Sequence, residues 1–246
     1  MNWPPDEIRI LHVDDDSNFL DVTAELLERE NDRFSVETAT SPKEGLAMVR
    51  DRPLDCIISD YDMPNTNGIE FLKRIRENNP KIPFILLTSK EIDTVASDAI
   101  SVGVTDYFQK KRISSQYTLL TNRVMNAVKQ YESDKRRERW RQAIDVATDD
   151  VGIVSADGEY VQLNDAYASV FDTSKADLAG THWWEWYPDE QVQRFEEEIF
   201  PALRKKETWR GRVVGRRTDG TQFDQVLLLS LLEDGGHMCI IEEYEN

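Results

Sequence analysis

The sequence has few cysteines and histidines and no long apolar run. Its 246 residues include 2 cysteines and 3 histidines, with no CxxC pair or Cys/His spacing that would hold zinc. We therefore expect Cys56 and Cys239 to be reduced core residues. The longest apolar stretch, residues 226–232, includes a serine and falls far short of the roughly 20 residues that a membrane-spanning helix needs. No membrane partner is expected.

A secretory signal is also missing, because the first residues have neither a basic start nor an apolar core. That absence predicts a cytoplasmic protein. Apolar residues make up 39% of the chain and charged residues 31%, a composition typical of a soluble globular protein. The length favours two domains.

Basic residues are in the minority throughout. The chain has 30 Lys and Arg against 47 Asp and Glu, a net charge of −17. Residues 1–128 carry 15 basic and 22 acidic side chains (−7), and residues 129–246 carry 15 and 25 (−10). This argues against nucleic acid as a partner, since binding it requires clustered Lys and Arg. Acid excess with 19 Arg but only 11 Lys is typical of proteins from salt-loving archaea, so a halophile source is our hypothesis.

Residues 1–128 alternate short apolar runs with amphipathic segments, the pattern of βαβ units and a doubly wound parallel sheet. Ser41, Pro42 and Glu44 mark the start of the second helix, as a cap, a proline at the first helical position and a capping-box glutamate. The strands are predicted at residues 8–13, 34–39, 54–59, 82–87 and 104–108, with helices between them and a fifth helix at about 115–131.

Residues 129–141 are almost wholly charged and contain no glycine or proline. We interpret them as a linker that continues the fifth helix; the alternative is an ordinary solvated helical face. Residues 142–246 then form an α+β domain with an antiparallel sheet. Its hairpin strands are predicted at 151–155, 160–163, 209–217, 221–232 and 237–244, and its helical stretches at 165–171 and 189–203.

Polar side chains stand at the carboxyl ends of four strands in the first domain. Asp14 and Asp15 follow the first strand, Asp60 the third, Thr88 the fourth and Lys110 the fifth. Ligands of open α/β sheets bind at this edge, where the strand order reverses, so we expect these five residues to converge on one pocket.

Three carboxylates in one pocket repel one another unless a positive charge lies among them. Mg²⁺ meets this need, because it takes oxygen ligands and leaves room for phosphate oxygens. Lys110 would add a point charge and Thr88 a hydroxyl donor for an incoming phosphoryl group. Asp60 is then the candidate nucleophile, and its product would be an acyl phosphate.

Four segments of the first domain form one recognisable pattern: Ile10–Asp16, Ser59–Pro64 with Gly68, Leu87–Ser89 and Asp106–Lys110. On these segments, residues 8–128 resemble a response-regulator receiver domain, which has a flavodoxin-like fold with five parallel strands. The resemblance implies that Asp60 is phosphorylated by a histidine kinase or phosphotransfer protein. It also implies that Asp15 and Asp60 bind Mg²⁺ directly, that the backbone carbonyl of Asp62 is a third ligand and that Asp14 acts through water.

The same resemblance makes Thr88 and Tyr107 a switch pair and assigns Lys110 to the phosphoryl oxygens. One departure is Lys111, which stands where the family usually has a proline after a cis bond, so this loop is expected to differ in shape. Asp16 is more typical of a helix cap than of a metal ligand.

The second domain has a pattern of its own in the segments Asp157-Gly158, Leu163–Tyr167, Trp209–Gly211 and Arg216–Gly220. On these segments, residues from about 141 to 246 resemble a PAS domain, a fold that serves as a ligand pocket, a dimer contact or both. The resemblance implies a five-stranded antiparallel sheet with flanking helices.

The ligand of this domain stays unknown from the sequence. Flavin photosensors of the fold carry a reactive cysteine in an Asn-Cys-Arg-Phe motif that this chain lacks, which argues against flavin. Haem would need His182 or His237 as axial ligand. We expect His237 at an exposed strand start, and His182 beside an aromatic group that forms core or interface and includes Trp183, Trp184 and Trp186, so haem is not expected.

No helix-turn-helix segment, phosphoacceptor-histidine helix, ATP-binding region or cyclase signature is recognised. We therefore expect no enzyme beyond the receiver's own phosphotransfer to Asp60 and dephosphorylation. The predicted function is phosphorelay signalling, with output through protein contacts and a homodimer. Two alternatives stay open: a PAS-based small-molecule sensor whose receiver mainly dimerises, and a phosphate sink that drains a kinase.

Overall fold

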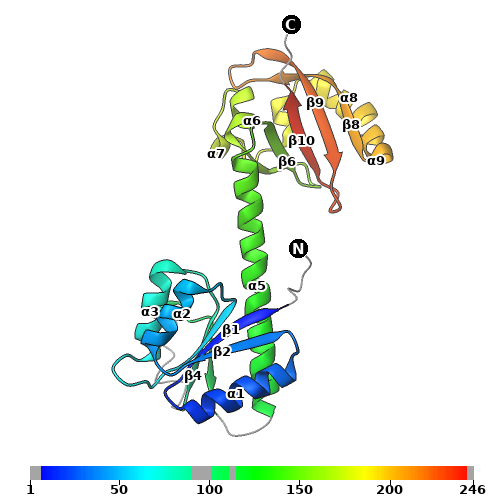
Figure 1. Cartoon of the computed structure of the whole chain (residues 1–246). Coiled ribbons are helices and arrows are strands. Elements are labelled where there is room, and N and C mark those ends of the chain that lie inside the picture. The colour runs from blue at the N-terminus through cyan, green and yellow to red at the C-terminus, as the bar shows by residue number, and fades with distance from the viewer. Residues whose placement is uncertain (1–6, 90–100, 111–114, 243–246) are drawn as a thin grey trace. The chain divides into compact units, whose positions relative to one another are not determined.

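The computed structural model describes residues 7–89, 101–110 and 115–242, and the chain divides into two compact units, residues 1–135 and 136–246 (Figure 1). Both sheets belong to the predicted classes, one parallel and one antiparallel. None of the helices in the described part combines the length and apolar character needed to traverse a bilayer. Cys56 and Cys239 are free and buried, as predicted.

The first unit contains a five-stranded parallel sheet in the order β2-β1-β3-β4-β5. The chain passes from β1 to one neighbour, β2, and then returns to β1's other side with β3. This reversal opens a crevice at the carboxyl ends of β1 and β3. The strands are β1 (Ile8–Val13), β2 (Phe34–Ala39), β3 (Cys56–Asp60), β4 (Phe84–Thr88) and β5 (Asp106–Gln109).

Helices cover both faces of this sheet because successive strand residues point to opposite sides. Leu11 and Val13 pack in one core with Phe71 of α3, whereas Ile8 and Ile10 pack in a second core with residues of α1 and α5. The helices are α1 (Ser17–Glu30), α2 (Pro42–Asp51), α3 (Gly68–Asn78) and α5 (Ser115–Asp145). The helix expected between β4 and β5 falls largely on residues 90–100, outside the described residues.

The start of α2 confirms the predicted cap and refines the capping box. The Ser41 hydroxyl accepts a hydrogen bond from the Glu44 backbone N–H at 3.4 Å. The Glu44 carboxylate reaches one residue further back than in a standard box, because it accepts from the backbone N–H of Thr40 at 2.8 Å. Pro42 occupies the first turn, where its missing N–H has no helical partner to lose.

Helix α5 is 31 residues long and runs without a break through residues 129–141. The charged segment 129–141 is therefore helical and continues the fifth helix, as predicted, and α5 ends at Asp145, beyond the predicted linker. Charged side chains one turn apart pair along it, since Arg141 forms ion pairs with Glu138 at 2.8 Å and with Asp145 at 3.4 Å.

The second unit contains a five-stranded antiparallel sheet in the order β7-β6-β10-β9-β8. Gly158, Gly220 and Gly235 have positive φ angles and allow the turns that precede β7, β9 and β10. Its strands are β6 (Asp150–Val154), β7 (Tyr160–Leu163), β8 (Thr208–Arg216), β9 (Gln222–Leu231) and β10 (His237–Glu242).

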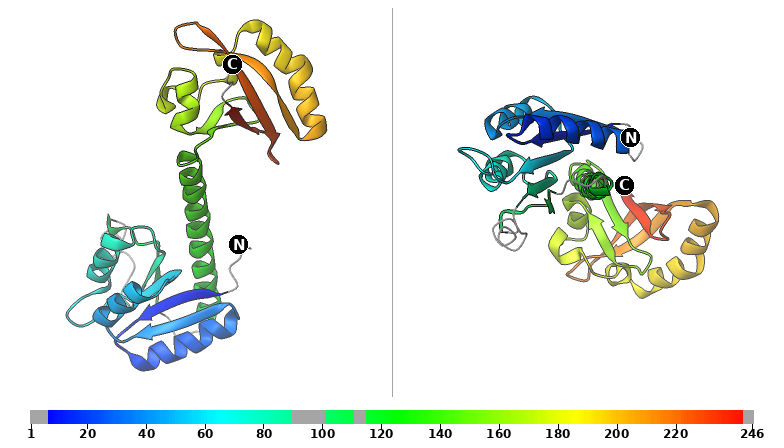
Figure 2. Two further views of the ribbon diagram at one scale, coloured as in Figure 1. Left: turned by 45° about the horizontal axis from the view of Figure 1, so that its top comes forward. Right: turned by 90° about the horizontal axis from the view of Figure 1, so that it is seen from below.

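Short helices fill the connection between β7 and β8. The later ones lie along one face of the sheet formed by β8, β9 and β10 (Figure 2), and Phe195 and Leu203 pack there against Leu227 and Leu229. The sequence did not predict the helix α7 (Lys175–Leu178) or the 3₁₀ helix Trp183–Trp186. The others are α6 (Asp165–Val170), α8 (Asp189–Arg194), a π-helical turn at Phe195–Ile199 and α9 (Phe200–Lys206).

The prediction for His237 is wrong, because this residue is buried at the start of β10. Its ring packs against Phe200, and burial lowers the pKa of His237 to about 4. A local Gly-Gly turn signal could not reveal that a distant helix covers the strand. The aromatic residues near His182 differ in burial. Trp183 is buried in the core, whereas Trp184 is 48% exposed.

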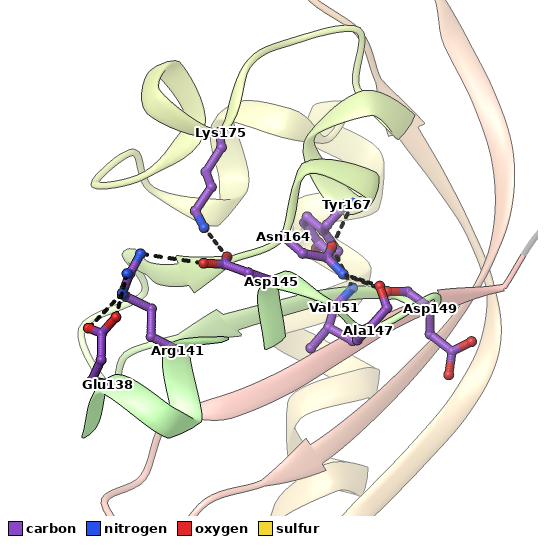
Figure 3. A network of polar contacts seen from close by, with 9 residues as sticks. All are labelled: Glu138, Arg141, Asp145, Ala147, Asp149, Val151, Asn164, Tyr167 and Lys175. Carbon is purple, nitrogen blue, oxygen red and sulfur yellow. Dashed lines mark hydrogen bonds and ion pairs between the residues drawn. The ribbon is translucent and has the colours of Figure 1, made fainter. Parts of the chain in front are cut away.

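The Asn164 side chain forms hydrogen bonds with four backbone groups near the start of the second unit (Figure 3). Its buried side chain accepts hydrogen bonds from the backbone N–H groups of Val151 and Tyr167 at 3.1 and 2.9 Å. Its amide donates to the carbonyl oxygens of Ala147 and Asp149 at 3.3 and 2.7 Å. One side chain therefore ties together the segment after α5, strand β6 and helix α6.

Asp145, the last residue of α5, adds an ionic connection close to this network (Figure 3). Its carboxylate pairs with Lys175 of α7 and with Arg141 one helical turn earlier. These contacts lie within the second unit, so the end of α5 is an integral part of that unit.

Replacing Asn164 with alanine should destabilise the second unit by about 2–4 kcal/mol, because the change leaves several buried backbone groups unpaired. Urea unfolding followed by tryptophan fluorescence measures this, since five of the six tryptophans lie in residues 136–246. Gln193→Ala removes an exposed amide and should change the free energy of unfolding by less than about 0.5 kcal/mol. Equal stability of the two variants would contradict the assigned role of Asn164.

Candidate functional site

The carboxyl ends of β1 and β3 bring the predicted acidic residues together. Asp14 directly follows β1 and Asp60 is the last residue of β3. Carboxylate oxygens of Asp14, Asp15 and Asp60 all lie within 4.8 Å of one another. Asp14 and Asp60 are buried and Asp15 is exposed, so the cluster opens to solvent on one side.

Hydrogen bonds of the Asp14 backbone and of its side chain hold this residue in place. Its N–H donates to the carbonyl oxygen of Ala39 on β2 at 3.1 Å. One of its carboxylate oxygens accepts from the backbone N–H of Asp16 at 3.0 Å. Asp16 in turn caps α1, as predicted, by accepting from the N–H groups of Asn18 and Phe19 at 3.0 and 3.2 Å.

The position of Asp60 depends on a close backbone approach by α3. The N–H of Gly68 donates to the carbonyl oxygen of Tyr61 at 2.9 Å. A Cβ atom on Gly68 would stand 2.3 Å from the carbonyl oxygen of Asp60, which is far inside van der Waals contact. Only glycine therefore lets the start of α3 close over the end of β3.

Lys110 links two of the carboxylates. Its ammonium lies 2.6 Å from Asp14 Oδ2 and 2.8 Å from Asp60 Oδ1. Its backbone N–H donates to the carbonyl oxygen of Thr88 at 2.8 Å, which ties the end of β5 to that of β4. The structure thus confirms that residues distant in sequence meet in this pocket.

Burial and charge act in opposite directions on these groups. Burial raises the pKa of Asp60, the hydrogen bond and charge of Lys110 lower it, and Asp14 raises it, so the net value lies above the ordinary one. Burial lowers the pKa of Lys110, but its hydrogen bonds to Asp14 and Asp60 outweigh that effect and the net value is raised.

The donor set fits a hard divalent cation. Three carboxylates and one ammonium leave two negative charges uncompensated, and all the available donors of the cluster are oxygens. Mg²⁺ binds through one or two carboxylates and otherwise keeps water or phosphate oxygens, which suits a cluster with one exposed member. The predicted ligand Asp62 has an exposed side chain, and its predicted contribution is a backbone carbonyl.

The predicted switch residues lie on the two strands beyond β3. Thr88 ends β4 and is buried. Tyr107 on β5 is partly buried and packs against the core on the α2 and α3 face of the sheet. Lys111, whose identity departs from the family pattern, lies outside the described residues.

Two residues of the site were not predicted from the sequence. The Phe19 ring lies beneath the Lys110 ammonium at 4.6 Å from nitrogen to ring centroid, and His12 packs against Phe19 at 5.8 Å between centroids. The alternation of side chains along β1 could have placed His12 on the same face as Ile8 and Ile10. Its contact with Phe19, the neighbour of Lys110, depends on the fold and could not be predicted from the sequence.

The described part of the second unit includes an open cavity of about 440 Å³, lined by residues that include Gln191, Arg194 and Val214. Smaller cavities lie closer to the core. One of about 90 Å³ is lined by residues that include Trp183, Phe200 and His237. A second, of about 10 Å³, lies beside Tyr160 and Cys239. Pockets for drug-sized ligands typically measure roughly 300–1,000 Å³.

Models of two protein families match the chain. The response regulator receiver domain matches residues 10–122, and the PAS fold matches residues 144–243.

Among curated proteins, the response regulator SaeR of Staphylococcus aureus (strain USA300) is 32% identical over 124 residues, which are 50% of this chain and 52% of SaeR. The chain thus spans about half the length of the curated relatives it matches.

Solved structures resemble each unit separately. A receiver domain protein from Clostridium thermocellum has 28% identity and a TM-score of 0.46, covering 51% of this chain and 97% of that one. The PAS domain of a LuxR-family transcriptional regulator from Burkholderia thailandensis, solved in complex with ethanol, has 19% identity and a TM-score of 0.39, covering 42% of this chain and 95% of that one.

The family matches agree with the sheet order and with the acidic cluster at the ends of β1 and β3. Residues 10–122 therefore belong to the response regulator receiver domains, and residues 144–243 belong to the PAS fold.

Proposed function

We propose that this protein is a phosphorelay response regulator whose receiver is phosphorylated on Asp60. The observation that carries the proposal is the ion pair between Asp60 and Lys110 inside a cluster of two further carboxylates. A nucleophile, a cation for phosphoryl oxygens and a set of oxygen ligands for a divalent metal thus share one pocket.

In the proposed reaction, a carboxylate oxygen of Asp60 attacks the phosphorus of a phosphohistidine on a partner kinase or phosphotransfer protein. The new oxygen–phosphorus bond forms as the nitrogen–phosphorus bond breaks, and the electron pair stays with the imidazole. Asp60 becomes an acyl phosphate. Mg²⁺, held by Asp15, Asp60 and the Asp62 carbonyl with Asp14 acting through water, would neutralise charge on the phosphoryl group.

Lys110 and Thr88 complete the phosphoryl site. The Lys110 ammonium already lies 2.8 Å from Asp60, so it is in place to bind an oxygen of the transferred group. The Thr88 hydroxyl would be drawn toward the same group, and the Tyr107 ring would turn inward behind it. This change would bias the receiver between two arrangements.

The output is proposed to pass through α5. Its first part packs against the receiver sheet through Leu120 and Val124, and its end is bound into the second unit through Asp145. We propose a homodimer in which phosphorylation changes the pairing of PAS domains or their contacts with a partner protein. The core cavities of about 90 and 10 Å³ favour this role, whereas the open cavity of about 440 Å³ keeps the small-molecule sensor as the alternative.

Wild-type protein incubated with Mg²⁺ and acetyl phosphate should gain the mass of one phosphoryl group, and Asp60→Asn should gain none, because an amide is not a nucleophile here. Intact mass spectrometry measures both. The matched control Asp21→Asn changes an exposed carboxylate on α1 and should behave as wild type. An unmodified wild type, even with a phosphorylated histidine donor, would contradict the proposed function.

Phosphorylation should also change the assembly of the full chain. We expect a shift in mass by light scattering, or altered hydrogen-exchange protection in residues 129–145, in wild type but not in Asp60→Asn. The physical reason is that α5 belongs to both units. If assembly and protection both stay unchanged while Asp60 is phosphorylated, the phosphate-sink alternative is favoured instead.

A further inference from the structure

The Lys110 ammonium needs a third support besides the two carboxylates. Lysine is a compact point charge on a flexible four-carbon stem, so two ion pairs restrain its distance from the acids but leave its approach direction free. The Phe19 ring supplies a surface on another side, with its centroid 4.6 Å from Lys110 Nζ. An aromatic face attracts a cation at this distance.

The Phe19 ring is itself held by a second ring. His12 on β1 meets it at an interplanar angle of 69° and 5.8 Å between centroids, an edge-to-face contact. Phe19 stands in the first turn of α1, three residues after the Asp16 cap, whose backbone N–H donates to Asp14. The Asp16 cap therefore holds the Asp14 carboxylate, and the Phe19 ring holds Lys110 beside that same carboxylate.

Packing alone does not explain a histidine at position 12. It is fully buried, and both ring nitrogens are without a hydrogen-bond partner in the described part of the chain. A buried polar atom without a partner carries a desolvation penalty that an aliphatic residue would avoid. Its neighbours on the same face of β1, Ile8 and Ile10, are aliphatic.

We propose that Phe19 is a positioning residue for Lys110, and that His12 fixes the tilt of the Phe19 ring. The ring holds the ammonium between Asp14 and Asp60, where the phosphoryl oxygens arrive. This inference rests on the proposed phosphorylation of Asp60 and adds to it two residues that act only through Lys110.

The first test is a double-mutant cycle on the rate of phosphorylation by acetyl phosphate with Mg²⁺. Phe19→Leu should slow the reaction about threefold to tenfold, the range expected for the loss of one partly buried cation–π contact. In a Lys110→Met background, Phe19→Leu should have no further effect. An equal loss in both backgrounds would overturn the proposal, because Phe19 would then act without Lys110.

The melting temperature distinguishes a positioning role of His12 from a role in packing alone. His12→Leu removes an unpaired polar ring, so it should leave the melting temperature equal or higher while slowing phosphorylation about twofold. Phe34→Leu is the matched control, since Phe34 packs in the same core as Phe19 but is not among the contacts of Lys110. It should lower the melting temperature and leave the phosphorylation rate well below melting unchanged. A His12→Leu protein with the wild-type rate would remove His12 from the proposal.

A further readout does not depend on phosphorylation. The ε-methylene protons of Lys110, assigned by their absence in Lys110→Met, should show an upfield ring-current shift in the NMR spectrum of wild type that disappears in Phe19→Leu. A wild-type spectrum without this shift would overturn the positioning of Lys110 by Phe19. If the shift is present but Asp60 is never phosphorylated, the proposed function fails and the contact stands.

Discussion

The repulsion among three carboxylates at the ends of β1 and β3 is the constraint on which the site depends. Asp14, Asp15 and Asp60 place oxygens within 4.8 Å of one another, and Lys110 compensates only one of their charges. Two negative charges in a partly buried pocket favour a divalent cation. The same excess charge keeps Lys110 ionised and bound to Asp60, where a phosphoryl group would be accepted.

The fold creates this concentration of charge through its strand order. Because β1 lies between β2 and β3, the turns after β1 and β3 leave the sheet in opposite directions and expose one crevice. Gly68 allows α3 to close against Asp60, and the Asp16 cap allows α1 to begin beside Asp14. Local backbone rules thus set the distances on which the proposed chemistry depends.

The sequence predicts most of the fold where a pattern repeats and fails where a contact is tertiary. The strands of the first unit lie within about two residues of their predicted ranges, because their apolar runs are short and bounded. The absence of glycine and proline predicts that α5 continues through residues 129–141, but no local signal marks its end at Asp145. His237 follows a local turn signal, but its burial depends on Phe200. Phe19 was not predicted as a residue of the site, because only the fold brings it to Lys110.

The most direct test of this account is the affinity for Mg²⁺, measured by calorimetric titration of the full chain without any phosphodonor. Wild type should bind one ion, and Asp15→Asn should bind at least about tenfold more weakly, since it removes a charge adjacent to the cation. Asp16→Asn is the matched control, because asparagine also caps a helix, and it should bind as wild type does. Equal affinities for wild type, Asp15→Asn and Asp16→Asn would contradict the account.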